Sequence, residues 1–404
     1  MPACQVCRSD RVVPGLDIGS HPVSSFFLPA ADAPEAAHRL ALGQCAACGT
    51  IQLLQPVPHV ALRAPYDWLF AREPEEHLDG LVDRLCALPG LDRAGAIAGL
   101  TVKDDTTLER FRRRGFARTW RVSLADDLGV ADPCANVETV QALTEPERMV
   151  RVAAAHGGPA ELLIVRHVIE HAENLQAFVE GLAALVRPGG YVMVEAPDCT
   201  TSLRLNDYAM IWEEHSLYFT PATQRPILDW GGFERVFEAL YPLPFENCMV
   251  LVARRTASPR TPLPDHEGAA QAGLLADYAA AFPEVTAELR STLEAARRRG
   301  PLALFGAGHL ACAFVNFHGL TDLFDFVADD TPQKQGLFLP GARLPILPSE
   351  ELVRRRVALA LLALSIGNED RVIARNAAFT ETGGQFRSVF AASPRSIRRG
   401  PGQQ

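Results

Sequence analysis

A chain of 404 residues is longer than one ordinary hydrophobic core can organise, so two or three domains are expected. Its 48% hydrophobic and 22% charged residues are typical of globular proteins, and its net charge of −9 disfavours broad nucleic-acid binding. No apolar run reaches the ~20 residues that cross a membrane, and the first residues show no secretory signal, so we expect a cytoplasmic protein.

Two short cysteine pairs lie within the first fifty residues. Cys4 with Cys7, and Cys45 with Cys48, each form a CxxC turn that directs two sulfur atoms at one point. Four thiolates in this pattern indicate one tetrahedral zinc ion; two disulfides or buried free thiols are the alternative. A closed four-cysteine site leaves no open coordination position. We therefore expect a structural zinc that folds residues 1–60, where long periodic segments are scarce.

Two apolar strands frame the clearest part of the chain. Residues 161–165 and 191–195 are continuous apolar runs, typical of strands buried on both faces, and residues 175–186 between them have helical periodicity. Strand, helix and strand at this spacing predict a parallel sheet covered by helices. Short apolar runs at 94–100 and 120–124 are expected to extend this sheet within a domain spanning 61–255.

Composition predicts the remaining boundaries. Residues 256–300 begin with a proline-rich linker and continue as an Ala- and Leu-rich helical segment in which Pro283 is a predicted break. A second α/β unit is expected over 301–393. The polar, glycine-rich residues 394–404 are predicted to be a disordered tail.

One segment carries a candidate general base. Glu214, His215 and Tyr218 lie within five residues, after a predicted strand. Open parallel sheets bind ligands beyond the carboxyl ends of their strands. A histidine beside a carboxylate can be held in one tautomer and act as a base near neutral pH. A loop histidine bonded to the backbone is the alternative.

A second segment places two histidines one helical turn apart. His167 and His171, with Glu170 between them, follow the predicted strand 161–165. The spacing resembles a metal site, but it is not HExxH and no third ligand stands out. Groups that cap the loop and its following helix are the favoured interpretation.

A glycine turn opens the second α/β unit. Gly306 and Gly308 follow a predicted strand and precede a helix, and Asp329 follows the next strand about twenty residues later. This context is typical of a nucleotide site, where a helix N-terminus receives phosphate.

Taken in order, these segments resemble the bacterial sugar C-methyltransferases that act on nucleotide-linked ketosugars. The four cysteines match, as do the segments 166–171, 188–198, 214–219 and 305–308, so the resemblance covers nearly the whole chain. It implies an α/β protein with an N-terminal zinc-binding module, a central class I methyltransferase-like Rossmann domain and a C-terminal Rossmann-like domain.

The resemblance also implies a transferase that uses S-adenosylmethionine (SAM). His215 would remove a proton alpha to a ketone, and the enolate would attack the SAM methyl group. Glu214 would orient the base or contact the sugar, and Tyr66 and Tyr218 would complete the catalytic set. The other implied residues are Leu100, Lys103, Asp105 and His167 for the cofactor, and His171, Asn247, Gly306, Gly308 and Asp329 for the nucleotide-linked sugar.

One departure from the family pattern concerns SAM. The family's first loop reads roughly Glu-x-Gly-x-Asn-Asp-Gly, whereas residues 99–108 keep only the equivalents of Asp105 and Leu108 and lack the tight-turn glycines. The acidic residue that the family has after the second strand, which would hold the ribose hydroxyls, is missing; Ser123 or Leu124 falls near that place. We therefore expect weak SAM binding or none. The alternatives are a SAM-independent epimerase or lyase, a non-catalytic nucleotide-sugar scaffold, and a nicotinamide-dependent reductase using the C-terminal glycine turn.

Overall fold

The structure, a computed structural model, contains two compact units, each built from segments that are separate in sequence. It describes residues 2–69, 73–243, 246–256, 258–263 and 266–398. The first unit comprises Met1–Pro14, Gly43–Cys199 and Glu214–Ala272, and the second comprises Gly15–Leu42, Thr200–Glu213 and Gly273–Gln404. The contiguous domain boundaries drawn from the sequence remain a prediction.

The first unit contains a six-stranded sheet with the order β5-β4-β6-β7-β10-β9. Its strands are β4 (Ile97–Gly99), β5 (Thr119–Arg121), β6 (Ala160–Arg166), β7 (Val186–Asp198), β9 (Phe233–Tyr241) and β10 (Asn247–Arg255). Strands β5, β4, β6 and β7 are parallel, and β10 and β9 are antiparallel to their neighbours. The predicted parallel sheet is confirmed, and its carboxyl edge holds the ends of β4, β6 and β7 with the start of β10.

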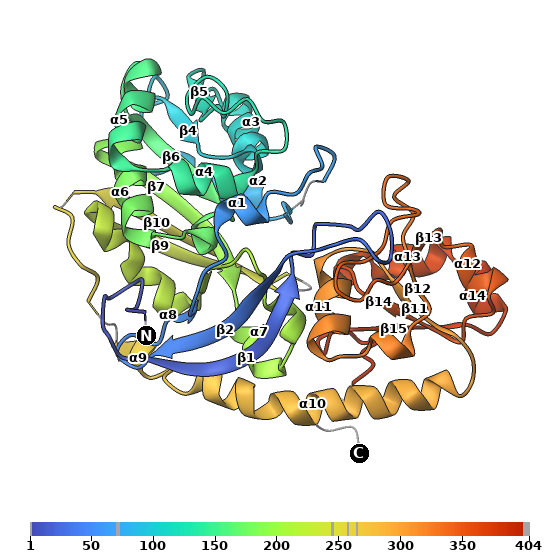
Figure 1. Cartoon of the computed structure of the whole chain (residues 1–404). Helices are drawn as coiled ribbons and strands as arrows, with labels where there is room; N and C mark the ends of the chain where they lie inside the picture. The colour runs from blue at the N-terminus through green and yellow to red at the C-terminus, as the bar shows by residue number, and fades with distance from the viewer. Residues whose placement is uncertain (1, 70–72, 244–245, 257, 264–265, 399–404) are drawn as a thin grey trace. The chain divides into compact units, whose positions relative to one another are not determined.

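Helices cover both faces of this sheet (Figure 1). Along β6, Leu162 and Ile164 pack with the apolar residues of α2 (Leu78–Cys86) and α3 (Asp105–Arg113). The alternate residues Leu163 and Val165 pack with those of α5 (Pro146–Ala155) and α6 (Leu175–Leu185). Because successive strand residues point to opposite faces, a continuous apolar run fills both layers.

A four-stranded sheet has the order β1-β2-β3-β8. Its strands are β1 (Val12–Pro22), β2 (Ala37–Cys45), β3 (Ile51–Leu53) and β8 (Leu217–Tyr218). The segment that carries Glu214 and His215 therefore leads into a strand of this sheet. The sequence placed that segment after a strand of the central sheet and did not predict β8, because two residues are too short for a periodic pattern.

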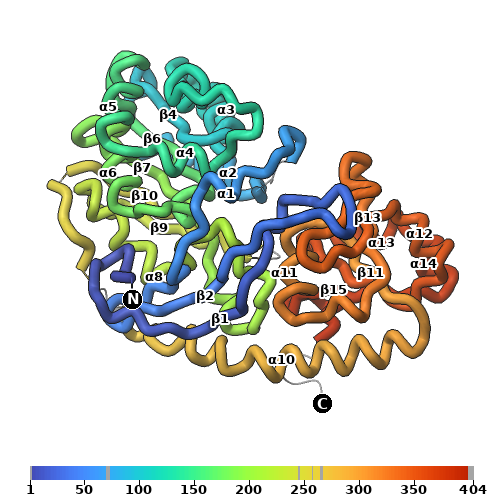
Figure 2. Tube along the Cα trace, in the orientation of Figure 1, coloured from blue at the N-terminus to red at the C-terminus, as the bar shows by residue number. Residues whose placement is uncertain are grey.

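The second unit contains a five-stranded parallel sheet with the order β13-β12-β11-β14-β15. Its strands are β11 (Leu302–Phe305), β12 (Phe326–Ala328), β13 (Ile346–Leu347), β14 (Leu359–Leu362) and β15 (Gln385–Ser388). Its helices include α10 (Leu274–Arg297), α11 (His309–Phe317), α12 (Glu351–Arg354), α13 (Glu369–Arg375) and α14 (Ala377–Glu381). Figure 2 traces these helices around the strands, and the predicted second α/β unit is confirmed.

The predicted helix break at Pro283 is wrong. Helix α10 runs without interruption from Leu274 to Arg297. The residues buried along it are Leu275, Tyr278, Val285, Leu289, Leu293 and Ala296. These positions recur at intervals of three, four and seven, so one apolar stripe continues past the proline and packing holds both halves on one axis.

The predicted disordered tail is ordered in its first part. Ser396 forms a bridge with Ser388 of β15, and the guanidinium of Arg398 donates to the backbone oxygen of Leu205, 2.8 Å away. Residues 399–404 lie outside the described residues.

The remaining helices are short. They are α1 (His59–Leu62), α4 (Val137–Leu143), α7 (Thr200–Leu205), α8 (Pro221–Gln224) and α9 (His266–Ala269). Of the helices in the described ranges, none combines the length and apolar character that crossing a membrane requires.

Candidate active site and metal centre

The four predicted zinc ligands converge. Their sulfur atoms lie within 4.8 Å of one another. The distance from Cys4 Sγ to Cys48 Sγ is 3.6 Å, and the distance from Cys7 Sγ to Cys45 Sγ is 3.7 Å. A tetrahedron with Zn–S bonds of ~2.3 Å has edges of about 3.8 Å, so the set fits zinc. These separations are far beyond a disulfide bond of ~2.05 Å.

The second knuckle requires a glycine. Gly49 follows Cys48 with φ +78°, a left-handed conformation. A Cβ atom on it would lie 1.9 Å from the backbone oxygen of Gly268. Any other residue would therefore push the knuckle away from the backbone at Gly268, which packs on it.

The zinc knuckle is joined to the candidate base through backbone pairing. The N–H of Cys45 donates to the oxygen of Thr50, 2.9 Å away, and closes the knuckle directly before β3. Strand β3 then pairs with β8, and the N–H of Leu53 donates to the oxygen of Ser216, 3.0 Å away. His215 immediately precedes this bonded residue, so the metal module fixes the backbone beside it.

His215 lies against a second histidine. Its side chain is nearly buried, at 9% exposed. Its ring meets that of His171 edge-on, with centroids 4.7 Å apart, and lies 6.1 Å from the ring of Tyr218. The ligand atoms of Glu138, His171 and Glu214 lie within 4.8 Å of one another, so the structure brings the predicted His171 and Glu214 together with Glu138, which was not predicted.

Charge holds His171 as an imidazolium. Its Nδ1 hydrogen-bonds to Oε1 of the buried Glu138. Burial alone would lower the pKa of His171, but the negative charges of Glu138, Glu170 and Glu214 outweigh it and raise the pKa to about 9. Its Nε2 has no hydrogen-bond partner among the residues that the structure describes. This nitrogen is a buried donor that can serve an oxygen of a ligand.

A second buried network surrounds Glu195, near the end of β7. The Glu195 carboxylate accepts hydrogen bonds from Arg166 Nη2 at 3.0 Å, His167 Nε2 at 3.0 Å and His77 Nε2 at 3.1 Å. Burial raises the pKa of Glu195, but these partners outweigh it and hold the pKa well below its usual range. The sequence analysis missed this network and Glu138. Arg166 and Glu195 could have been found as charged ends of apolar strands, whereas no pattern marks His77.

The favoured capping role for the His167–His171 segment is wrong. Helix α6 begins at Leu175, and its N-cap is Asn174, whose side chain accepts from the N–H of Ala177 at 3.3 Å. The two histidines are instead members of the buried networks around Glu195 and Glu138.

The turn after β4 is closed by a carboxylate. Asp104 Oδ2 accepts from the N–H groups of Leu100 and Thr101, at 2.7 and 2.8 Å. Asp104 Oδ1 accepts from the N–H of Arg166, 3.0 Å away at the end of β6. Burial raises the pKa of Asp104 to about 7. Backbone donors that a glycine-rich turn would offer to a cofactor are therefore engaged within the protein.

The other side chains expected at SAM also have protein partners. Lys103 Nζ donates to Glu73 Oε1 at 2.7 Å, and Asp105 Oδ1 accepts from Arg121 Nε at 2.7 Å. Ser123, the position expected near the ribose, donates through its N–H to Asp127 Oδ2 at 2.8 Å and through its hydroxyl to Asp126 Oδ2 at 2.9 Å. The closed β4 turn does not offer SAM the backbone donors that the family's glycine loop would.

The remaining candidate residues fall into both units. In the first unit, Asn247 Nδ2 donates to Asp198 Oδ2 at 3.2 Å, and the Tyr66 ring lies 4.9 Å from that of Trp68. In the second unit, Asp329 accepts at 2.8 Å from the N–H of Ala307, between Gly306 and Gly308. The Asp329 carboxylate thus stabilises the glycine turn itself. The assignment of all these residues to a substrate remains a prediction.

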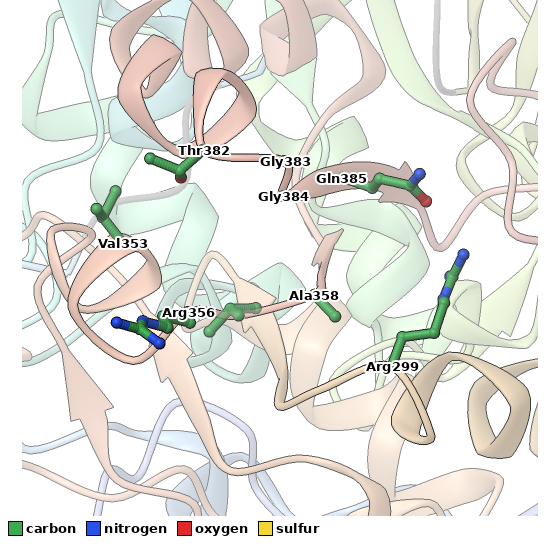
Figure 3. A pocket seen from close by; sticks show the side chains of 9 residues that line it. Arg299, Val353, Arg356, Ala358, Thr382, Gly383, Gly384 and Gln385 are labelled. Atoms are coloured by element: carbon green, nitrogen blue, oxygen red, sulfur yellow. The ribbon is translucent and has the colours of Figure 1, made fainter.

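The second unit also has an open hollow of about 530 Å³. Arg299 and Arg356 lie on opposite sides of it, below the Gly383–Gly384 turn (Figure 3). It adjoins Ala358 and Gln385, at the amino ends of β14 and β15, whereas parallel sheets bind ligands at their carboxyl ends. This hollow is separate from the predicted glycine turn.

Two known domain families match segments toward the two ends of the chain. Residues 4–62 match a domain described as zinc-binding, and residues 264–390 match the C-methyltransferase C-terminal domain. The chain is 26% identical over 399 residues to C-methyltransferase NovU from Streptomyces niveus, covering 95% of this chain and 94% of that protein.

Two solved structures of methyltransferases align with part of the chain. An O-methyltransferase family protein from Burkholderia thailandensis is 16% identical with a TM-score of 0.30, covering 46% of this chain and 58% of its own. Magnesium protoporphyrin IX methyltransferase from Synechocystis is 16% identical with a TM-score of 0.31, covering 47% and 91%. These scores are low, and the architecture is defined by the strand pairings above.

The buried pair of His171 and Glu138 predicts a pH-dependent stability. The pKa of His171 is raised from its ordinary 6.5 to about 9, so the pair stabilises the fold fully below pH 6.5 and this contribution is lost as pH rises through 9. As the pH rises from 6.5 through 9, the unfolding free energy of Glu138→Gln should fall by about 2–3 kcal/mol less than that of the parent. Urea denaturation at several pH values measures the difference.

Glu147→Gln, an exposed change in α5, provides the control and should keep the parent's pH dependence. Identical pH profiles for the parent and Glu138→Gln would contradict a charged His171.

Proposed function

We propose that this chain is a member of the C-methyltransferase family and that it forms an enolate at the carbon beside the carbonyl of a nucleotide-linked ketosugar. His215 is the general base. The observation that carries this proposal is the nearly buried His215 ring, 4.7 Å from the imidazolium of His171, on backbone that is paired to the metal module.

The two histidines suit the two halves of proton abstraction. A neutral His215 removes the proton, the C–H electron pair forms the new C=C bond, and the carbonyl pair moves onto oxygen. His171 Nε2, buried and without a hydrogen-bond partner among the described residues, donates a hydrogen bond to that developing oxyanion. A preorganised charged donor in a buried site stabilises such charge strongly. Glu138 keeps His171 protonated, and Glu214 adds negative charge that favours the same state.

The fate of the enolate distinguishes two functions. Return of a proton to the same carbon gives exchange or epimerisation and needs only groups of the chain. The closed β4 turn is the observation in favour of this alternative. Transfer of a methyl group is the reaction that the comparisons support, because residues 264–390 match the C-methyltransferase C-terminal domain and the relative named C-methyltransferase aligns with 95% of the chain.

His215→Ala should lower deuterium wash-in at the carbon beside the ketone by roughly 10²–10⁴-fold, because that is the usual contribution of a positioned base. The assay incubates candidate nucleotide-linked ketosugars in heavy water and follows exchange by NMR. Glu214→Gln should lose less, since Glu214 supports the charge on His171 rather than taking the proton. Exchange in His215→Ala as fast as in the parent would remove His215 from the role of base.

Calorimetric titration with SAM separates the two fates. We expect weak binding or none, because Asp104 engages the backbone donors of the β4 turn. Titration of the same preparation with the substrate found by deuterium exchange is the control for intact protein. A micromolar dissociation constant for SAM would overturn proton return and establish methyl transfer.

A further inference from the structure

Glu170 is a buried carboxylate that the proton abstraction described above does not use. It lies in the short turn Ile169–His171, between β6 and α6, and is only 2% exposed. Its Oε2 atom has no hydrogen-bond partner among the residues that the structure describes. Buried polar atoms of folded proteins are nearly always paired, because an unpaired one costs free energy. This oxygen is therefore an acceptor available to a ligand.

Two histidines face Glu170 from distances longer than a hydrogen bond. His167 Nδ1 lies 3.7 Å and His171 Nε2 lies 3.9 Å from Glu170 Oε1. N–H···O hydrogen bonds span only about 2.7–3.2 Å. Burial raises the pKa of Glu170, but its interactions with these two histidines outweigh burial and lower the pKa below its usual value. Glu170 is therefore ionised, and an ionised carboxylate only accepts hydrogen bonds.

Glu170 lies beside both groups of the proposed proton abstraction. A carboxylate oxygen of Glu170, a ring nitrogen of His171 and a ring nitrogen of His215 all lie within 4.8 Å of one another. In that mechanism, His171 Nε2 donates to the carbonyl oxygen of the substrate. A donor and an acceptor this close together match the two oxygens of an α-hydroxy ketone, because its carbonyl and hydroxyl are on neighbouring carbons.

We propose that Glu170 accepts a hydrogen bond from a sugar hydroxyl on the carbon beside the carbonyl, and thereby selects ketosugars that carry this hydroxyl. The assignment rests on the proposed function and narrows its substrate class to α-hydroxy ketones. The hydroxyl is on one neighbour of the carbonyl, since the other neighbour presents its C–H to His215. His171 and Glu170 then bind the two oxygens side by side, one as donor and the other as acceptor.

The charges around Glu170 favour a hydroxyl over an amine as the donor. Burial would lower the pKa of His171 and His167, but neighbouring carboxylates outweigh it. They raise the pKa of His171 to about 9 and that of His167 well above its usual range. Both rings that face Glu170 are therefore cationic and would repel an ammonium group placed between them. A hydroxyl donates a hydrogen bond without adding charge.

Deuterium exchange with two matched substrates tests the assignment. One nucleoside-diphosphate ketosugar carries the hydroxyl beside its carbonyl, and the other has hydrogen in its place. Each rate is divided by the uncatalysed exchange rate of the same compound, which removes differences in intrinsic acidity. In the parent, kcat/KM for exchange should be roughly 10- to 100-fold lower for the deoxy compound, because it leaves the buried carboxylate without a donor.

This comparison uses the parent alone, so it does not depend on any variant folding. Equal exchange of the two compounds is the result expected if a buried water serves Glu170, and it would overturn the assignment while leaving the proposed function intact. Exchange of neither compound would overturn the proposed function and the assignment with it.

Variants of Glu170 separate recognition of the hydroxyl from a structural role. Glu170→Ala should exchange the two compounds at similar rates, and Glu170→Gln, which keeps a neutral acceptor, should discriminate less than the parent. Glu147→Gln, exposed on α5, is the control and should keep the parent's discrimination. A purely structural role would slow both compounds equally in Glu170→Ala and preserve their ratio, which would contradict the assignment.

Discussion

The pairing of β3 with β8 is the constraint on which the candidate site depends. The zinc knuckle ends at Cys48, β3 begins at Ile51, and the hydrogen bond from Leu53 to Ser216 fixes the residue after His215. A two-residue strand has little stability of its own. Because metal binding supplies the folding energy of such modules, the position of the base becomes a consequence of zinc coordination. The N-terminal module can thereby fix the backbone beside His215, about 170 positions later.

Burial and charge then determine which side chains are ionised near the carboxyl edge of the six-stranded sheet. Glu138 and His171 form one buried pair and Glu195 collects three donors, so ionised groups persist where isolated charges would be costly. A buried carboxylate also closes the β4 turn, because Asp104 accepts hydrogen bonds from the N–H groups of Leu100 and Thr101. The parallel sheet is thus present, while two backbone donors of its β4 turn are engaged by the protein's own carboxylate.

The sequence predicted elements that have a period and missed relations between distant residues. Continuous apolar runs identified β6, β7 and β11, and CxxC spacing identified the four cysteines, because each pattern is local. The partners of His171 and His167 could not be predicted, since Glu138 and Cys248 are brought in only by the sheet. Pro283 misled the analysis because the apolar stripe of α10 outweighs the local proline signal.

The most direct test of the central claim is amide hydrogen exchange in Cys7→Ser, which removes one zinc ligand. If the zinc module positions the base, exchange should accelerate in peptides covering β3 and residues 215–218, while β6 stays as protected as in the parent. Unchanged protection of β3 and residues 215–218 in a variant shown to lack that zinc ion would contradict the account.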